Sequence, residues 1–135
     1  MSNDNTPILV IDLKKNRLRI YKRTLHLLGD PKYVKFLVNP QNMHIVVIPS
    51  RPVDTASQKV NWKQIGDNKC CEFYSKNLIQ SLHNLCCQMT QDQTFRIFGK
   101  LYQMDDERLA RFKMNDLILV NNIKEEDEEP IRVTV

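Results

Sequence analysis

The chain has 135 residues, of which 41% are hydrophobic and 27% are charged. This is enough apolar material for one ordinary domain with its own core, and it argues against disorder of the whole chain. Only 3 residues are glycine, which argues against Gly-rich phosphate-binding loops. The N-terminus lacks the pattern of a secretory signal, and no apolar run approaches the roughly 20 residues of a membrane span. We therefore expect a cytoplasmic protein with no membrane partner.

Charge is distributed unevenly along the chain, whose formal net charge is +4. Residues 1–122 hold 18 basic and 11 acidic residues, a net charge of +7, whereas residues 123–135 hold 2 basic and 5 acidic residues, a net charge of −3. The segment 12–35 alone has a net charge of +6. A basic cluster beside an acidic tail favours a polyanionic partner, a regulatory tail, or both. The alternative is that these charges only solvate an exposed sheet face.

The four cysteines occur as two adjacent pairs, Cys70-Cys71 and Cys86-Cys87. Adjacent residues do not suit the geometry of a disulfide, and a zinc ribbon needs two residues between its paired cysteines. The spacing therefore predicts buried or half-buried reduced thiols, with neither a metal site nor a cofactor. The alternative is a metal site built from the cysteines and a histidine.

The first elements in chain order are two strands. Residues 7–13 form an apolar run of strand type, and residues 17–22 alternate between basic and apolar side chains. This alternation is typical of a half-buried strand. It predicts that Arg17, Arg19 and Tyr21 share the open face.

A short helix and a hairpin should follow. Residues 23–29 have room for a helix that ends at Gly29. Residues 32–38 and 43–48 have strand character, and the intervening Asn-Pro-Gln-Asn is typical of a turn.

The second half repeats this order of elements. Residues 50–68 are predicted to be a connector pinned to the core by Trp62, and residues 69–74 to be a strand. Residues 76–89 show a continuous apolar stripe at helical spacing, with Ser75 as the N-cap.

The last elements should be strands and a tail. Residues 94–102 and 108–114 are predicted to pair as a second hairpin, and residues 116–120 could add a final strand. Residues 123–135 are expected to be an acidic, flexible tail.

The chain divides into two units, about 8–49 and 69–120, and within them residues 17–48 and 69–114 each have the order β-α-β-β. One such unit cannot bury its apolar face alone, and two can close around one core. We therefore expect a single α+β domain over residues 1–122, an internal repeat, and a compact pseudo-two-fold barrel or saddle.

Residues 17–49, RLRIYKRTLHLLGDPKYVKFLVNPQNMHIVVIP, resemble the swapped-hairpin unit of AbrB-type transition-state regulators. The pairing of two units in one chain is similar to the MraZ branch, which opens each unit with an Asp and, a few residues later, an Arg; Asp12 and Arg17 resemble that pattern. Arg23 lies near the family's second arginine position. The resemblance implies DNA binding by a basic strand surface, a role in transcription regulation, and self-association.

The basic strand and its flanks are therefore the candidate DNA-binding site. Cations neutralise phosphates and release counterions, and Arg or Asn side chains can contact base edges. The candidate nucleic-acid-binding residues are Lys14, Lys15, Asn16, Arg17, Arg19, Lys22 and Arg23.

The sequence thus favours a non-enzymatic DNA-binding or regulatory protein over two other classes of function. A protein–protein interaction or assembly module with an exposed sheet edge, including a homo-oligomer, would suit the strand-rich chain. An enzyme would need a recognisable motif, and the chain has no nucleophile elbow, P-loop or zinc-protease motif. We therefore predict no catalytic residues and no enzymatic activity.

Overall fold

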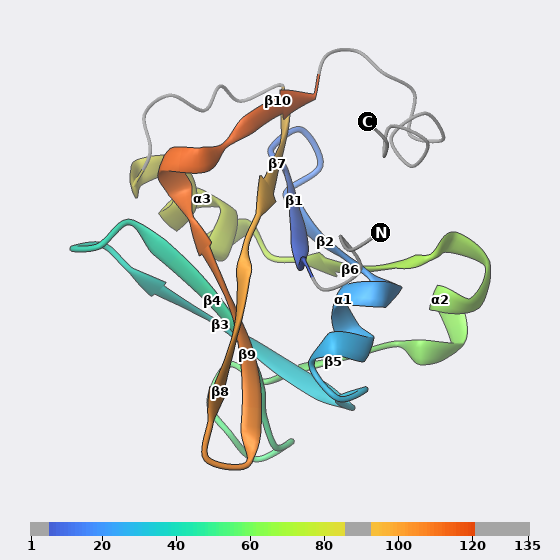
Figure 1. Cartoon of the computed structure of the whole chain (residues 1–135). Coiled ribbons are helices and arrows are strands. Elements are labelled where there is room, and N and C mark those ends of the chain that lie inside the picture. Colours follow the sequence, from blue (N-terminus) through green and yellow to red (C-terminus); the bar gives the residue numbers. More distant parts are fainter. Residues whose placement is uncertain (1–5, 86–92, 121–135) are drawn as a thin grey trace.

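The computed structural model describes residues 6–85 and 93–120, which form a mixed α+β fold with two five-stranded antiparallel sheets (Figure 1). The strands of sheet A, in their order across the sheet, are β10 (Ile118–Val120), β7 (Thr94–Phe98), β1 (Ile8–Asp12), β2 (Arg17–Tyr21) and β6 (Cys70–Tyr74). The strands of sheet B are β5 (Gln58–Lys59), β3 (Tyr33–Asn39), β4 (His44–Pro49), β9 (Glu107–Lys113) and β8 (Lys100–Met104).

The inner face of sheet A is continuous and apolar. Leu9 lies opposite Ile20 in β2 and opposite Ile97 in β7, and Ile11 lies opposite Leu18. Residues directly opposite each other in paired strands project to the same face. These five side chains are completely buried, and burying each one stabilises the fold by about 1.5–3 kcal/mol.

The inner face of sheet B packs against the inner face of sheet A and closes the core. Phe36 of β3 lies opposite Val47 of β4, which lies opposite Ala110 of β9. The Phe36 ring meets the ring of Phe73 in β6 edge-on, with 5.3 Å between the centroids. Aromatic pairs in this geometry contribute beyond the area that they bury. The alternation of strand residues thus leaves one outer face on each sheet.

Gly99 lies where the chain leaves β7 in sheet A and enters β8 in sheet B. A Cβ atom at this position would lie 2.5 Å from the carbonyl oxygen of Arg111 and 2.5 Å from the ring of Phe112. Glycine permits this close approach of two chain segments because it has no side chain. The predicted single strand over residues 94–102 is therefore wrong, because it is divided between the two sheets. The predicted second hairpin is formed by β8 and β9.

Helix α1 (Lys22–Leu27) ends as the sequence predicts. Gly29 follows it with a positive φ of 91°, a conformation that glycine adopts without steric cost. The backbone N–H of Asp30 then donates to the carbonyl of Leu25 at 3.0 Å, which satisfies one of the last carbonyls of the helix.

Helix α3 (Lys76–Leu85) begins at the predicted N-cap. The Ser75 hydroxyl accepts a hydrogen bond from the backbone N–H of Leu78 at 3.2 Å. Ile79 and Leu82 are buried in the core. The remainder of the predicted helix, residues 86–89, lies outside the described residues.

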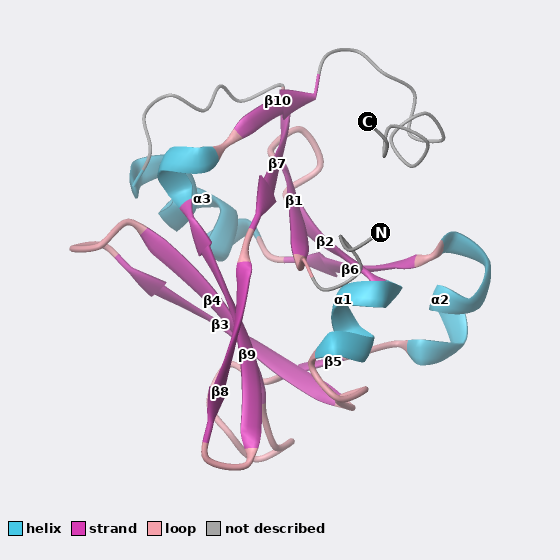
Figure 2. Cartoon of the chain, viewed as in Figure 1, coloured by secondary structure: helices cyan, strands magenta, loops and turns pink. Residues whose placement is uncertain are grey.

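The predicted connector over residues 50–68 is wrong as a description, because it contains β5 and the helix α2 (Trp62–Asn68). The predicted anchoring role of Trp62 is confirmed, since its ring packs against the core and its Nε1 donates to the carbonyl of Pro31 at 2.8 Å. The Trp62 ring also stacks on His26 of α1 with 5.9 Å between centroids. Figure 2 accordingly shows α1 and α2 next to each other.

The predicted α+β class is confirmed, and strands lie where residues 7–13, 17–22, 32–48, 69–74 and 116–120 predicted them. Of the two predicted shapes, the barrel is wrong, because the described strands form two sheets that each keep two edge strands. The saddle stays a prediction. A pseudo-two-fold relation between the halves stays a prediction, and the acidic tail over residues 123–135 lies outside the described part. Within residues 6–85 and 93–120, no helix has the length and apolar content needed to cross a membrane.

Candidate nucleic-acid-binding surfaces

Two surfaces collect cations, and each is the outer face of one sheet. The outer face of sheet A is the side of that sheet turned away from the core, and it includes all of the basic residues predicted within β2. Asp12 lies opposite Arg17, and Arg19 lies opposite Glu72. The charged members of this face are Asp12, Arg17, Arg19, Glu72 and Arg96.

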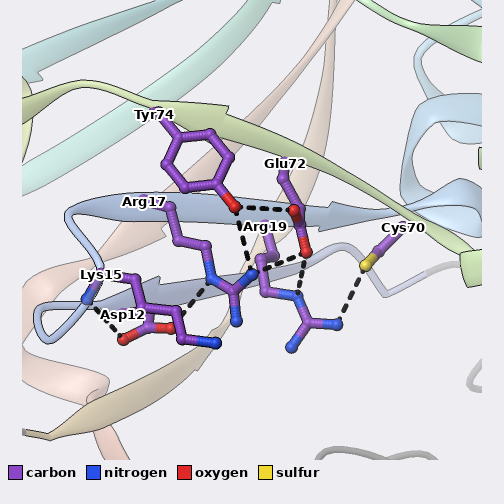
Figure 3. A network of polar contacts seen from close by, with 7 residues as sticks. All are labelled: Asp12, Lys15, Arg17, Arg19, Cys70, Glu72 and Tyr74. Atoms are coloured by element: carbon purple, nitrogen blue, oxygen red, sulfur yellow. Dashed lines mark hydrogen bonds and ion pairs between the residues drawn. The ribbon is translucent and has the colours of Figure 1, made fainter. Parts of the chain in front are cut away.

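Arg17 is the centre of an ionic network on this face, shown in Figure 3. Its Nε donates to Asp12 at 2.9 Å, and one of its terminal nitrogens donates to Glu72 at 2.7 Å. The same nitrogen lies 3.5 Å from the hydroxyl of Tyr74, which in turn donates to Glu72 at 3.0 Å. The side chains of Arg17 and Asp12 are only 5% and 7% exposed. The pair is therefore a buried, hydrogen-bonded ion pair.

The pKa of Arg17 reflects these contacts. Burial acts to lower it, whereas the hydrogen bonds with Tyr74 and Asp12 and the charges of Glu72 and Asp12 raise it, and the net shift is upward. A buried cation held by two carboxylates is stable only while its partners are present, because an uncompensated buried charge is strongly unfavourable.

Arg19 lies two residues further along β2 and is also largely covered. Its side chain is 12% exposed, and its Nε lies 3.8 Å from Glu72. One terminal nitrogen donates to the sulfur of Cys70 at 3.2 Å. Burial raises the pKa of the Cys70 thiol, and Arg19 acts in the opposite direction.

The prediction that Arg17 and Arg19 present open cations is wrong. The strand alternation does place them on the outer face, but carboxylates from β1 and β6 pair with them there. The other predicted residues are distributed around the two ends of β2. Lys14, Lys15 and Asn16 are exposed in the turn before it, Lys22 is half-buried, and Arg23 is exposed in α1.

Arg96 of β7 also belongs to the outer face of sheet A and was not predicted from the sequence. Val10 of β1 lies opposite both Arg96 and Arg19, so the two arginines flank one fully buried valine. The Arg-Ile alternation within β7 could have indicated an outward arginine. Its position beside β1 depends on strand pairing, which no local pattern specifies.

The outer face of sheet B is more open and more basic. Lys100 lies opposite Arg111 in β9, and Lys113 lies opposite His44 in β4. Lys59, Lys100 and Lys113 are exposed. The charged members of this face are Lys35, Lys59, Lys100, Glu107, Arg111 and Lys113. Five cations thus share this face with one carboxylate.

Two carboxylates lie near these cations, and one of them, Asp54, interacts electrostatically with Lys35. Glu107 is the first residue of β9 and lies opposite Met104, whereas Lys100 and Arg111 lie opposite each other at the other end of the same strand pair. Asp54, in the loop after β4, pairs with Arg51 at 3.4 Å. The sequence missed this surface because its cations come from four separate strands.

Arg111, Tyr102 and His44 indicate the electrostatic character of this face. The Arg111 guanidinium lies over the Tyr102 ring at 4.4 Å from the centroid, and it also donates to the Tyr102 hydroxyl. Desolvation, together with the positive charges of Arg111 and Lys113, lowers the pKa of His44. A histidine that resists protonation beside two cations marks a region of positive potential.

The described part of the chain contains no group of three or more His, Cys, Asp or Glu residues placed to hold a metal ion. Cys70 and Cys71 are buried free thiols, and burial is the first cause of the raised pKa of each. Cys86 and Cys87 lie outside the described residues.

Comparisons with family models, with curated proteins and with solved structures found no match. The resemblance to AbrB-type regulators therefore stays a prediction.

Proposed function

We propose that this protein binds DNA without acting as an enzyme, and that it does so through the outer face of sheet B. The observation that carries the proposal is the gathering of five cations with one carboxylate on an open sheet face. Phosphate neutralisation and the release of counterions supply most of the driving force for such binding.

The outer face of sheet A supports this function less well. Three arginines there share their surroundings with two carboxylates, and Arg17 and Arg19 are 5% and 12% exposed in their side chains. A phosphate would have to compete with Asp12 and Glu72 for these guanidinium groups. The resemblance to AbrB-type regulators supports DNA as the polyanion and a regulatory role, with a different strand surface as the contact.

Two triple variants of equal charge change test the proposal. Lys59, Lys100 and Lys113 are replaced by Glu in one variant, and Lys14, Lys15 and Arg23 in the other. All six side chains are exposed, so both variants should fold. The measurement is fluorescence anisotropy with a labelled DNA oligonucleotide at two salt concentrations. We expect the sheet B variant to lose at least about 100-fold in affinity and the other variant less than about fivefold.

The reverse ranking would assign binding to the β1–β2 turn and the start of α1, as the sequence predicted. Absence of binding by the unmodified protein at low salt would reject DNA binding altogether.

A protein–protein contact is the second candidate, and it is favoured by the edge strand β10. Ile118 and Leu119 are 49% and 40% exposed there, and Phe98 in the neighbouring strand is 43% exposed. Exposed apolar edge strands are templates for pairing with another chain. Sedimentation over a range of concentrations tests it: Ile118→Lys should abolish any self-association, and a strictly monomeric protein would exclude this edge as a homo-oligomer contact.

A further inference from the structure

The outer face of sheet B carries apolar side chains among its cations. One row across four strands runs from Leu37 through Val46 and Arg111 to Lys100. Leu37 is 48% exposed, and neither Leu37 nor Val46 belongs to the core cluster between the sheets. Leu37 is thus exposed and Val46 half-buried in the middle of this basic row, and the attraction of phosphates alone accounts for neither.

A second row of basic, apolar and aromatic residues lies next to this one on the same face. Lys35 lies opposite Ile48, and Tyr102 lies opposite Leu109. Tyr102 is half-buried, with the Arg111 guanidinium covering one side of its ring. This contact orients the ring on the sheet and places a cation directly beside an aromatic surface.

The breadth of the sheet disfavours insertion into a duplex groove. Five strands spaced about 4.8 Å apart make a face about 19 Å across, whereas the major groove of B-DNA is about 12 Å wide and admits a helix or a two-stranded ribbon. The bases of a duplex are also stacked on one another, so the leucine, valine and isoleucine of this face would gain no partner. Unpaired bases can stack on an aromatic ring and can pack against apolar side chains.

We propose that the outer face of sheet B binds single-stranded DNA, with its cations on the phosphates and with Tyr102 and the central apolar side chains against the bases. This inference rests on the proposed DNA-binding function and specifies the form of DNA that is bound.

The first test compares three probes by anisotropy: a labelled oligo-dT 12-mer, a 12-base-pair DNA duplex, and oligo-U of the same length. We expect oligo-dT to bind at least about tenfold more tightly than the duplex and no more weakly than oligo-U. Tighter binding of the duplex would overturn the single-strand inference and leave the proposed function intact. Tighter binding of oligo-U would overturn the choice of DNA, and absence of binding to all three would overturn both proposals.

A poly-glutamate peptide of equal charge completes this comparison. If it competes as well as oligo-dT, the face recognises negative charge alone, and the inference about bases is wrong. We expect weak competition, because the peptide has no ring surfaces to stack.

The second test uses matched tyrosine variants. Tyr102→Leu keeps an apolar side chain and removes the ring, and it should weaken oligo-dT binding by about 5- to 150-fold. Tyr102→Phe keeps the ring and should bind within about threefold of the unmodified protein. Tyr74→Leu is the control, because Tyr74 is 61% exposed on the outer face of sheet A, and it should leave affinity unchanged. Equal affinity of the two leucine variants would overturn the stacking role.

Chemical-shift mapping of the unmodified protein gives an answer even if a variant fails to fold. Addition of oligo-dT should move the resonances of Leu37, Val46 and Tyr102. Movement confined to residues of the outer face of sheet A, such as Arg19 and Glu72, would overturn the inference.

Discussion

The outer faces of the two sheets both present cations at alternating strand positions, but the surroundings of these cations differ. On sheet A, Arg17 and Arg19 meet Asp12 and Glu72 from the flanking strands and are largely buried. On sheet B, Lys100 and Lys113 are exposed, and the residues opposite them are Arg111 and His44. Strand alternation therefore assigns a cation to a face, whereas the neighbouring strands decide whether that cation is available to a ligand.

The largest expected effect concerns Arg17. Arg17→Met should lower the free energy of unfolding by about 3–5 kcal/mol, because it leaves Asp12 and Glu72 without their buried cation. Arg23→Met, at an exposed position, is the control and should change it by no more than about 0.5 kcal/mol. Urea unfolding followed by circular dichroism measures both. Equal, small effects of the two substitutions would mean that Arg17 contributes no more to stability than an exposed arginine does.

The next largest effect is expected at Gly99, where the chain passes from β7 in sheet A to β8 in sheet B. Gly99→Ala should destabilise the protein by about 1–3 kcal/mol, because the added methyl group would meet the Arg111 carbonyl and the Phe112 ring. Gly66 in α2 is a matched control, since a Cβ there meets nothing within 4 Å. Gly66→Ala should stabilise the helix by up to about 1 kcal/mol. If thermal unfolding shows that Gly99→Ala and Gly66→Ala change the stability in the same direction, the close approach at Gly99 is contradicted.

Unlike Arg17, the exposed lysines of sheet B should contribute little to stability and should contribute to DNA binding. Lys100→Gln and Lys113→Gln should each change the unfolding free energy by less than about 0.5 kcal/mol. Each should also reduce the slope of log affinity for oligo-dT against log salt by about 0.7. Anisotropy titrations at several salt concentrations measure that slope. A marked loss of stability with an unchanged slope would assign these lysines a structural role.

The smallest expected effect concerns the pH dependence of His44. Since desolvation and the charges of Arg111 and Lys113 lower its pKa in the folded state, the folded protein takes up a proton at this site less readily than the unfolded chain. The stability contribution is therefore present above the ordinary histidine pKa of about 6.5 and is lost as pH falls through the folded-state value.

Bound DNA should change this titration. Phosphates near Arg111 and Lys113 would offset their charges and raise the pKa of His44, which an NMR titration with and without oligo-dT would measure. A His44 pKa that does not move on binding would place the DNA elsewhere on the protein.

Much of the local structure was predictable because it depends on contacts close in sequence. Gly29 ends α1, Ser75 begins α3, and the β3–β4 hairpin follows from its turn residues. The spacing of Asp12 and Arg17 also stands out in the sequence, and their side chains form a hydrogen bond across the β1–β2 hairpin. Short-range hydrogen bonding and the two-residue period of strands suffice for these features.

The candidate surfaces could be predicted only in part. The local concentration of basic residues, together with Asn16, points to seven candidate residues near β2, but Glu72 is 55 residues from the Arg17 that it pairs with. Lys59, Lys100 and Lys113 are far in sequence from the basic segment 12–35, which contains Lys35. The order of strands in sheet B brings all four lysines onto one face.

Sequence patterns were therefore sufficient for the α+β class, most of the strands, and the face of β2 on which its arginines lie. The burial and pairing of Arg17, and the gathering of open cations on sheet B, follow from the tertiary structure. Alternation is a property of one strand, whereas neutralisation and exposure depend on which strands pair with it. Gly99 sends the chain from one sheet to the other and thereby separates the two outer faces.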